Sequence, residues 1–123
     1  MSNDTGRYEE FWNRALNFSN MGVQGLKPDE VDLDEEVVFY TSPSQKYAMQ
    51  CMGNIKNKKI LEIGCGLGIN AIILARDGAY VTATDIAEKR VEWIKELVAK
   101  TGLEGRIRVA HVCRASPIWF EFL

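Results

Sequence analysis

In the second half of the chain, short runs of apolar residues alternate with longer segments in which apolar and polar residues are mixed. Short apolar runs occupy Ile60–Ile63, Tyr80–Thr84 and Ile107–Cys113, as is typical of buried strands. Between them, residues 69–76 are apolar around most of their circumference and residues 88–100 are apolar on one face, and both patterns predict helices. The order strand, helix, strand, helix, strand predicts an α/β fold whose sheet is parallel.

The first half of the chain has a less regular pattern. Five apolar residues recur near its start at spacings of three and four: Tyr8, Phe11, Trp12, Ala15 and Leu16. This spacing predicts one helix face, with its aromatic residues in the core. In Asp29–Glu36, six of eight residues are acidic and none is basic, which predicts a solvated loop. Ser42, Pro43 and Gln45 match an N-cap, a first helical position and a capping box, and predict a helix that ends near Met52.

Composition and charge narrow the classes of protein. The 123 residues suffice for one globular domain, and 15 basic against 17 acidic side chains leave a net charge of -2, which argues against a nucleic-acid partner. No apolar run approaches the ~20 residues that span a bilayer, and the polar start is unlike a signal peptide. We therefore expect a cytoplasmic protein with its three cysteines reduced. A single histidine, His111, and the absence of a CxxC pair predict no metal site.

A glycine-rich loop follows the first predicted strand. Glu62, Gly64, Gly66 and Gly68 form the pattern E-x-G-x-G-x-G, and Asp85 stands at the end of the second strand. Glycines allow the backbone to turn sharply and to approach a ligand closely, and the next helix offers unpaired N–H groups. A carboxylate at the second strand end can accept hydrogen bonds from both hydroxyls of a ribose. The two features together predict a crevice for a nucleoside.

Other readings of the same residues remain open. The dinucleotide fingerprint G-x-G-x-x-G requires a glycine where this chain has Ile69, and no G-K-[ST] follows to make a phosphate-binding Walker loop. The glycine loop could also be a structural turn, and Asp85 a plain helix cap. Cys65 has no neighbouring histidine or lysine to activate it, so a small filler is favoured over a nucleophile.

Residues Ile60–Asp85 resemble the S-adenosylmethionine-binding half of the class I methyltransferase family. The resemblance implies a Rossmann-like sheet with flanking helices and S-adenosylmethionine as the cofactor. It also implies a division into residues 1–41, an amino-terminal helix and acidic lid or loop segment, and residues 42–123, a partial Rossmann-like cofactor-binding domain. The residues that the resemblance places against the cofactor are Glu62, Gly64, Cys65, Gly66, Gly68, Asp85 and Ile86. In the family the strand-end acid holds the ribose and the residue after it packs against adenine.

The chain departs from the family pattern in its last part. From Lys59 onward 65 residues remain, enough for three strands at roughly 30 residues per βαβ unit, but not for the family's larger sheet. The sheet is therefore expected to be truncated after its third strand, and the catalytic residues are unknown. Arg114–Ser116 stand where the family commonly has an acid for adenine. Ile60–Ile63 would form an open apolar edge, and Ile118–Leu123 could pair only beside the third strand, so we expect a homo-oligomer or a missing half supplied from elsewhere.

These observations favour methyl transfer from S-adenosylmethionine to an unknown acceptor. A small molecule is favoured over nucleic acid because the charge balance is acidic. One alternative is a non-catalytic cofactor-binding remnant that acts through self-association. A second alternative is a nicotinamide-dependent oxidoreductase, which Ile69 disfavours.

Overall fold

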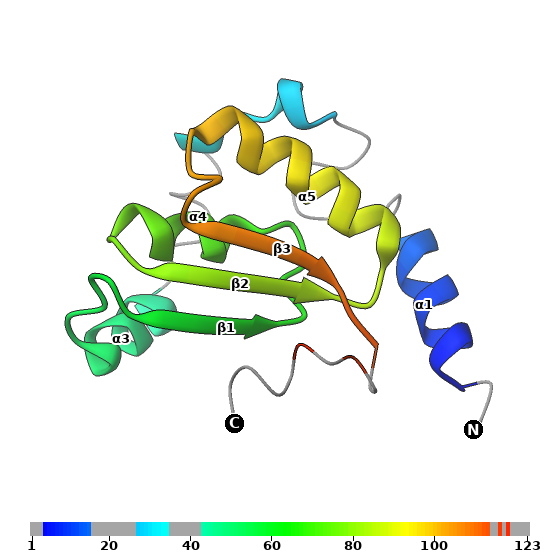
Figure 1. Cartoon of the computed structure of the whole chain (residues 1–123), viewed down its shortest axis with the longest axis horizontal. Helices are drawn as coiled ribbons and strands as arrows, with labels where there is room; N and C mark the ends of the chain where they lie inside the picture. The colour runs from blue at the N-terminus through cyan, green and yellow to red at the C-terminus, as the bar shows by residue number, and fades with distance from the viewer. Residues whose placement is uncertain (1–3, 16–26, 35–42, 114–115, 117, 119–123) are drawn as a thin grey trace.

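The fold is built on a parallel three-stranded sheet (Figure 1). The computed structural model describes residues 4–15, 27–34, 43–113, 116 and 118. In these ranges, β1 (Lys59–Ile63), β2 (Tyr80–Asp85) and β3 (Ile107–His111) lie side by side in the order β1-β2-β3. The predicted α/β fold with a parallel, Rossmann-like sheet is thus confirmed. The third strand ends two residues earlier than predicted, because its partner β2 ends at Asp85, which pairs with His111.

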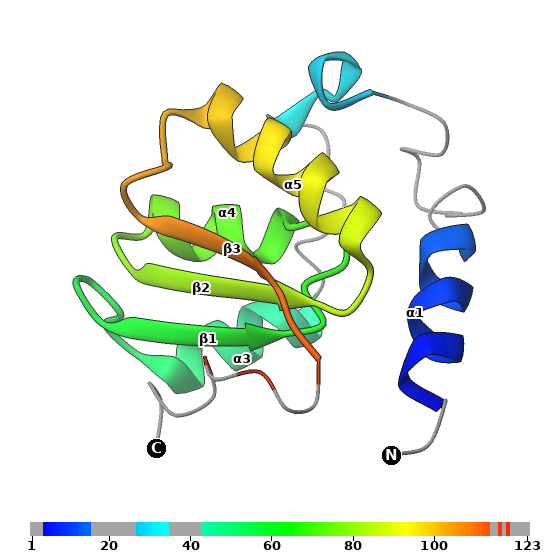
Figure 2. The ribbon, with the colours of Figure 1, turned by 45° about the vertical axis from the view of Figure 1, so that its right-hand side comes forward.

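Two helices cover one face of the sheet. α4 (Ile69–Arg76) connects β1 to β2, and α5 (Glu88–Thr101) connects β2 to β3. Both were predicted from the apolar pattern, within one residue at their ends. The core lies between these helices and the sheet, and its largest fully buried side chains are Ile69, Ile72, Ile94, Leu97 and Val81. No described helix covers the opposite face (Figures 1 and 2), where 72% of Ile63 and 44% of Tyr80 are exposed.

The amino-terminal helix forms as predicted, but its aromatic side chains are not in the core. α1 (Asp4–Ala15) contacts α5, and it stands beside the sheet layer in both views (Figures 1 and 2). The exposed fractions are 63% for Tyr8 and 59% for Phe11, so the prediction that they are core residues was wrong. The physical reason is that α4 and α5 already fill the covered face of the sheet. The side chain of Trp12, and Leu16 as a whole, lie outside the described residues.

The acidic segment is more ordered than a solvated loop. Pro28–Glu30 form a short 3-10 helix, η2, whose acidic side chains are exposed as predicted. Pro28 and Val31 are buried, and η2 contacts α5, where Lys100 Nζ donates to the Pro28 carbonyl at 2.7 Å. Two apolar residues, one just before the acidic run and one within it, therefore anchor the segment. Residues 35 and 36 lie outside the described residues.

The helix before β1 and the β1 edge of the sheet both agree with the sequence pattern. α3 spans Pro43–Met52 as predicted, although its predicted cap, Ser42, lies outside the described residues. β1 lies at one edge of the described sheet, which confirms the predicted open edge within those residues. Residues 119–123 lie outside the described part, so the pairing of the tail stays a prediction. None of the described helices is long and apolar enough to cross a membrane.

Candidate cofactor site

The glycine loop joins the carboxyl end of β1 to the start of α4. It is closed by two backbone hydrogen bonds, from Cys65 N to the Thr84 carbonyl at 2.8 Å and from Gly68 N to the Cys65 carbonyl at 2.9 Å. The φ of Gly66 is +58°, in the left-handed region that favours glycine. A Cβ atom placed on Gly64 or Gly66 would meet no described atom within 4 Å. The loop therefore presents bare backbone to open space, as close approach of a ligand requires.

Asp85 faces the mouth of this loop. Its side chain is 6% exposed, and its Oδ2 accepts a hydrogen bond from Gly66 N at 3.2 Å. Its Oδ1 accepts one from Ala87 N at 2.9 Å, immediately before α5 begins. Asp85 therefore contacts both the glycine loop, as a residue of the site would, and the start of α5, as a helix cap would. Because a carboxylate has about four acceptor positions, two remain for ligand hydroxyls.

Glu62 lies on the helix-covered side of β1 and shares the site with Asp85. The pKa of Glu62 is raised to about 7, chiefly by burial and also by the Asp85 carboxylate, against the lowering effect of the Asn70 amide. Its Oε2 atom is buried and has no hydrogen-bond partner among the described residues. A buried carboxylate oxygen without a partner is costly, and a cationic ligand group would satisfy it.

The side chain of Cys65 is a neutral filler, as predicted. The pKa of the Cys65 thiol is raised to about 12, chiefly by burial and also by the carboxylates of Asp85 and Glu62. The residue is only 6% exposed. A buried thiol between two carboxylates does not ionise at neutral pH, so it cannot act as a nucleophile.

His111 connects the amino-terminal helix to the rim of the site. Its Nε2 lies 2.9 Å from the Ile86 carbonyl and 3.1 Å from Glu9 Oε1 of α1. Because both neighbours are acceptors, Nε2 must carry the proton. Sequence reasoning considered His111 only as a metal ligand, and it could not foresee this contact, which depends on the pairing of His111 with Asp85 across two strands.

Two amides behind the loop were also missed. Gln45 of α3 donates from Nε2 to Asn70 Oδ1 at 2.5 Å, and the Asn70 amide lowers the pKa of Glu62. Asn70 is the second residue of α4, and a polar residue at the start of a mostly apolar helix was the available signal.

Arg114 and Ala115, which replace the expected adenine-binding acid, lie outside the described residues. Within the described ranges, no three histidine, cysteine or acidic side chains could hold a metal ion together.

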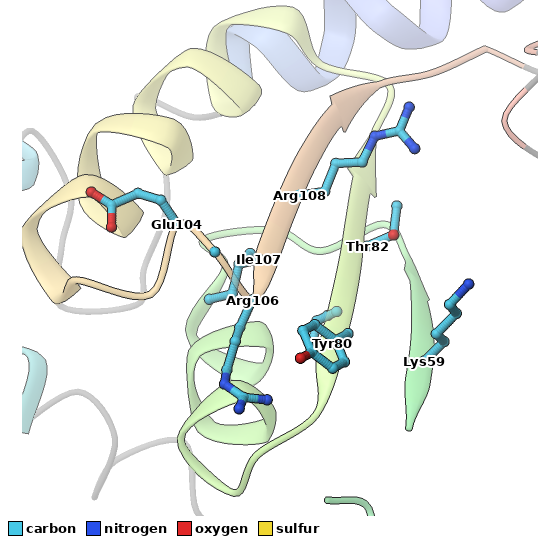
Figure 3. A pocket seen from close by; sticks show the side chains of 9 residues that line it. Lys59, Tyr80, Thr82, Glu104, Arg106, Ile107 and Arg108 are labelled. Atoms are coloured by element: carbon cyan, nitrogen blue, oxygen red, sulfur yellow. The ribbon is translucent and has the colours of Figure 1, made fainter. Parts of the chain in front are cut away.

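A hollow of about 260 Å³ lies at the other end of the strands, away from the glycine loop (Figure 3). Arg106 stacks over the Tyr80 ring there, with its guanidinium carbon 4.8 Å from the ring centroid, and its Nη1 donates to the Gly78 carbonyl at 2.7 Å. The charged ends of Lys59, Arg106 and Arg108 point apart in Figure 3. The three basic side chains therefore do not point at a common place where an anion could bind. Arg106 instead contacts the Tyr80 ring and the Gly78 carbonyl.

Comparison with known sequences agrees with this geometry. A family profile described as a methyltransferase domain matches residues 60–120. The ubiquinone biosynthesis O-methyltransferase of Psychrobacter cryohalolentis is 30% identical over 104 residues, which cover 84% of this chain and 39% of that protein. Its namesake from Alkalilimnicola ehrlichii is 39% identical over 65 residues, which cover 53% of this chain and 25% of that protein. The chain thus matches well under half the length of these curated relatives.

Solved structures share the fold. Geranyl diphosphate C-methyltransferase from Streptomyces coelicolor superposes with a TM-score of 0.65 at 15% identity, covering 92% of this chain and 48% of that one. Magnesium protoporphyrin IX methyltransferase from Synechocystis gives a TM-score of 0.63 at 20% identity, covering 89% and 52%. The parallel sheet, the glycine loop and these matches lead to one assignment. The chain belongs to the class I S-adenosylmethionine-dependent methyltransferase family.

Proposed function

We propose that this chain is the cofactor-binding part of a methyltransferase that transfers a methyl group from S-adenosylmethionine to a small-molecule acceptor. The observation that carries the proposal is the Asp85 carboxylate at the mouth of the glycine loop, 3.2 Å from Gly66 N. A small acceptor is supported by relatives named for ubiquinone biosynthesis and by the net charge of -2, which disfavours nucleic acid.

The site residues suit the three parts of this cofactor. In our proposal, Asp85 accepts hydrogen bonds from the ribose hydroxyls, Ile86 packs against adenine, and Glu62 faces the methionine ammonium. The loop residues that lie under the ribose and methionine with their backbone are Gly64, Cys65, Gly66 and Gly68. Two observations support the fit: the open space beside Gly64 and Gly66, and the buried, unpartnered Oε2 of Glu62.

The chemistry needs mainly alignment of donor and acceptor. The bound cofactor supplies an electrophilic methyl group on a sulfonium, which a nucleophile displaces in line. Orientation alone is worth ~7–11 kcal/mol in such reactions. The residues proposed here orient the donor side of the reaction, through the loop backbone and the two carboxylates. The groups that hold the acceptor are not assigned, so the catalytic residues remain unknown.

Isothermal titration will separate this proposal from an oxidoreductase. We expect S-adenosylhomocysteine to bind the protein and NAD to give no heat of binding, because Ile69 stands where the dinucleotide fingerprint needs glycine. Binding of NAD without S-adenosylhomocysteine would reverse the assignment. If S-adenosylhomocysteine binds but no labelled methyl group reaches any small molecule of a cell extract, the non-catalytic remnant is favoured instead.

We also propose that β1 pairs with a second copy of the chain. β1 lies at an edge of the described sheet, and Ile63 at its end is 72% exposed, so the edge offers unpaired backbone groups beside an apolar side chain. Sedimentation velocity at micromolar concentration should show a dimer or larger species. Ile63→Lys should shift it towards monomer, because an edge charge opposes strand pairing. Tyr47→Lys, at a 69% exposed position on α3, is the matched control and should change nothing. A monomeric parent protein contradicts the proposal.

A further inference from the structure

We propose that His111 is a positioning residue that holds the Asp85 carboxylate in place through the peptide group between Ile86 and Ala87. His111 and Asp85 are paired residues at the ends of β3 and β2, which lie side by side (Figure 1). The inference rests on the proposed function only for the identity of the ligand. The hydrogen bonds themselves can be tested in the free protein.

One peptide group connects the two side chains. Its carbonyl, which belongs to Ile86, accepts a hydrogen bond from His111 Nε2 at 2.9 Å. Its N–H group, which belongs to Ala87, donates to Asp85 Oδ1 at 2.9 Å. The peptide is trans, so the carbonyl and the N–H group point in opposite directions. A donor that holds the carbonyl therefore also aims the N–H group at the carboxylate, and hydrogen bonds in such a row strengthen one another.

This peptide group lies just beyond the part of the chain that strand pairing holds. The backbone carbonyl of Asp85 accepts a hydrogen bond from Val112 N at 3.1 Å, so the end of β2 is tied to β3. Ile86 follows the last residue of β2 and α5 begins only at Glu88, so the Ile86 carbonyl belongs to neither element. The side chain of His111 supplies the donor that a neighbouring strand would otherwise provide.

The two oxygens of the buried Asp85 carboxylate are held from two sides. Ala87 N donates to Oδ1, and Gly66 N of the glycine loop donates to Oδ2 at 3.2 Å. A carboxylate whose orientation is fixed beforehand loses less conformational freedom when ligand hydroxyls bind to it. His111 thus contributes to affinity through the peptide group and not by contact with the ligand.

The same nitrogen of His111 also faces α1. Glu9 Oε1 lies 3.1 Å from Nε2, farther than the Ile86 carbonyl at 2.9 Å. One N–H group carries one hydrogen, and the shorter contact identifies the carbonyl as its main acceptor. The side chains of His111 and Glu9 are both partly exposed, and exposed pairs contribute little to stability. The effect of His111 should therefore pass through the peptide group and not through α1.

The first experiment uses nuclear magnetic resonance of the free protein. The amide proton of Ala87 should resonate at low field because its acceptor is a carboxylate, and His111→Leu should move the signal upfield. His111→Gln keeps an N–H donor of similar reach and should restore most of the shift. Glu9→Gln removes the charge on α1 but keeps the peptide contact, so it is the matched control and should match the parent. An Ala87 signal that is the same in all four proteins overturns the inference, and so does a failure of His111→Gln to restore it.

The second experiment adds the ligand. In calorimetry with S-adenosylhomocysteine, His111→Leu should bind about 3- to 10-fold more weakly than the parent, and His111→Gln and Glu9→Gln within about twofold of it. In the Asp85→Ala protein, His111→Leu should cause no further loss, because the group that it positions is absent.

Two results of this experiment would overturn the inference. An equal loss from His111→Leu in the parent and in Asp85→Ala would show that His111 acts independently of Asp85. A loss in Glu9→Gln as large as in His111→Leu would show that His111 acts through α1. If the parent protein does not bind at all, the proposed function fails, whereas the Ala87 signal still decides the positioning role.

Discussion

Asp85→Ala should weaken the binding of S-adenosylhomocysteine by about 1–3 kcal/mol, which is roughly 5- to 150-fold in Kd. The substitution removes the proposed acceptor for the ribose hydroxyls. It also leaves Gly66 N without the bond that ties the loop to the end of β2, and Ala87 N without its partner at the start of α5. Isothermal titration measures the loss, and circular dichroism on the same samples checks that the variant is folded.

Asp77→Ala provides the matched control for this prediction. Asp77 is an exposed aspartate at the far end of α4, so its replacement makes the same change in charge away from the loop. The control should bind S-adenosylhomocysteine as the parent protein does. If Asp85→Ala also binds within twofold of the parent, Asp85 does not contact the ligand, and its role is limited to its hydrogen bonds with Gly66 N and Ala87 N.

Gly68→Ala should lower the free energy of unfolding by about 2–5 kcal/mol. Gly68 has a φ of +78°, and an L-residue in this left-handed region costs about 1–2 kcal/mol. A Cβ on Gly68 would also lie 2.8 Å from Cγ2 of Ile94, a fully buried core residue of α5, and overpacking of a core costs about 1–3 kcal/mol. Urea denaturation, followed by circular dichroism, measures the change.

Gly66→Ala separates the two contributions. Its φ of +58° is also left-handed, but an added Cβ there meets no described atom within 4 Å. This variant should therefore lose only the conformational part, about 1–2 kcal/mol. Equal losses at the two positions would mean that α5 yields to the new methyl group, and that Gly68 is needed for its backbone conformation alone.

The pattern of apolar residues was sufficient to predict the sheet and its two covering helices. Residues 69–76 and 88–100 were expected as helices and were found as Ile69–Arg76 and Glu88–Thr101. These patterns can be recognised from neighbouring residues alone, because the repeat of a helix or strand determines which nearby side chains share a face. The proximity of the glycine loop and Asp85 was predictable for a related reason: the carboxyl ends of parallel strands meet at one edge of the sheet.

Contacts between elements could not be predicted in the same way. The spacing of Tyr8 and Phe11 indicates a helix face, but whether that face is buried depends on the room left by α4 and α5. His111 contacts the carbonyl of Ile86 only because β3 pairs with β2 in one register. Gln45 and Asn70 are 25 residues apart and meet through the packing of α3 near the loop.

The sequence by itself therefore determined the kind of protein: a parallel sheet, a glycine loop, and an acid one strand away, all readable from short-range periodicity and spacing. The tertiary structure alone decided how the site is supported. It brought the amides of Gln45 and Asn70 together at the start of α4, and it left one carboxylate oxygen of Glu62 buried without a partner among the described residues. Orientation and burial of a polar side chain depend on neighbours from distant parts of the chain, and no local pattern encodes them.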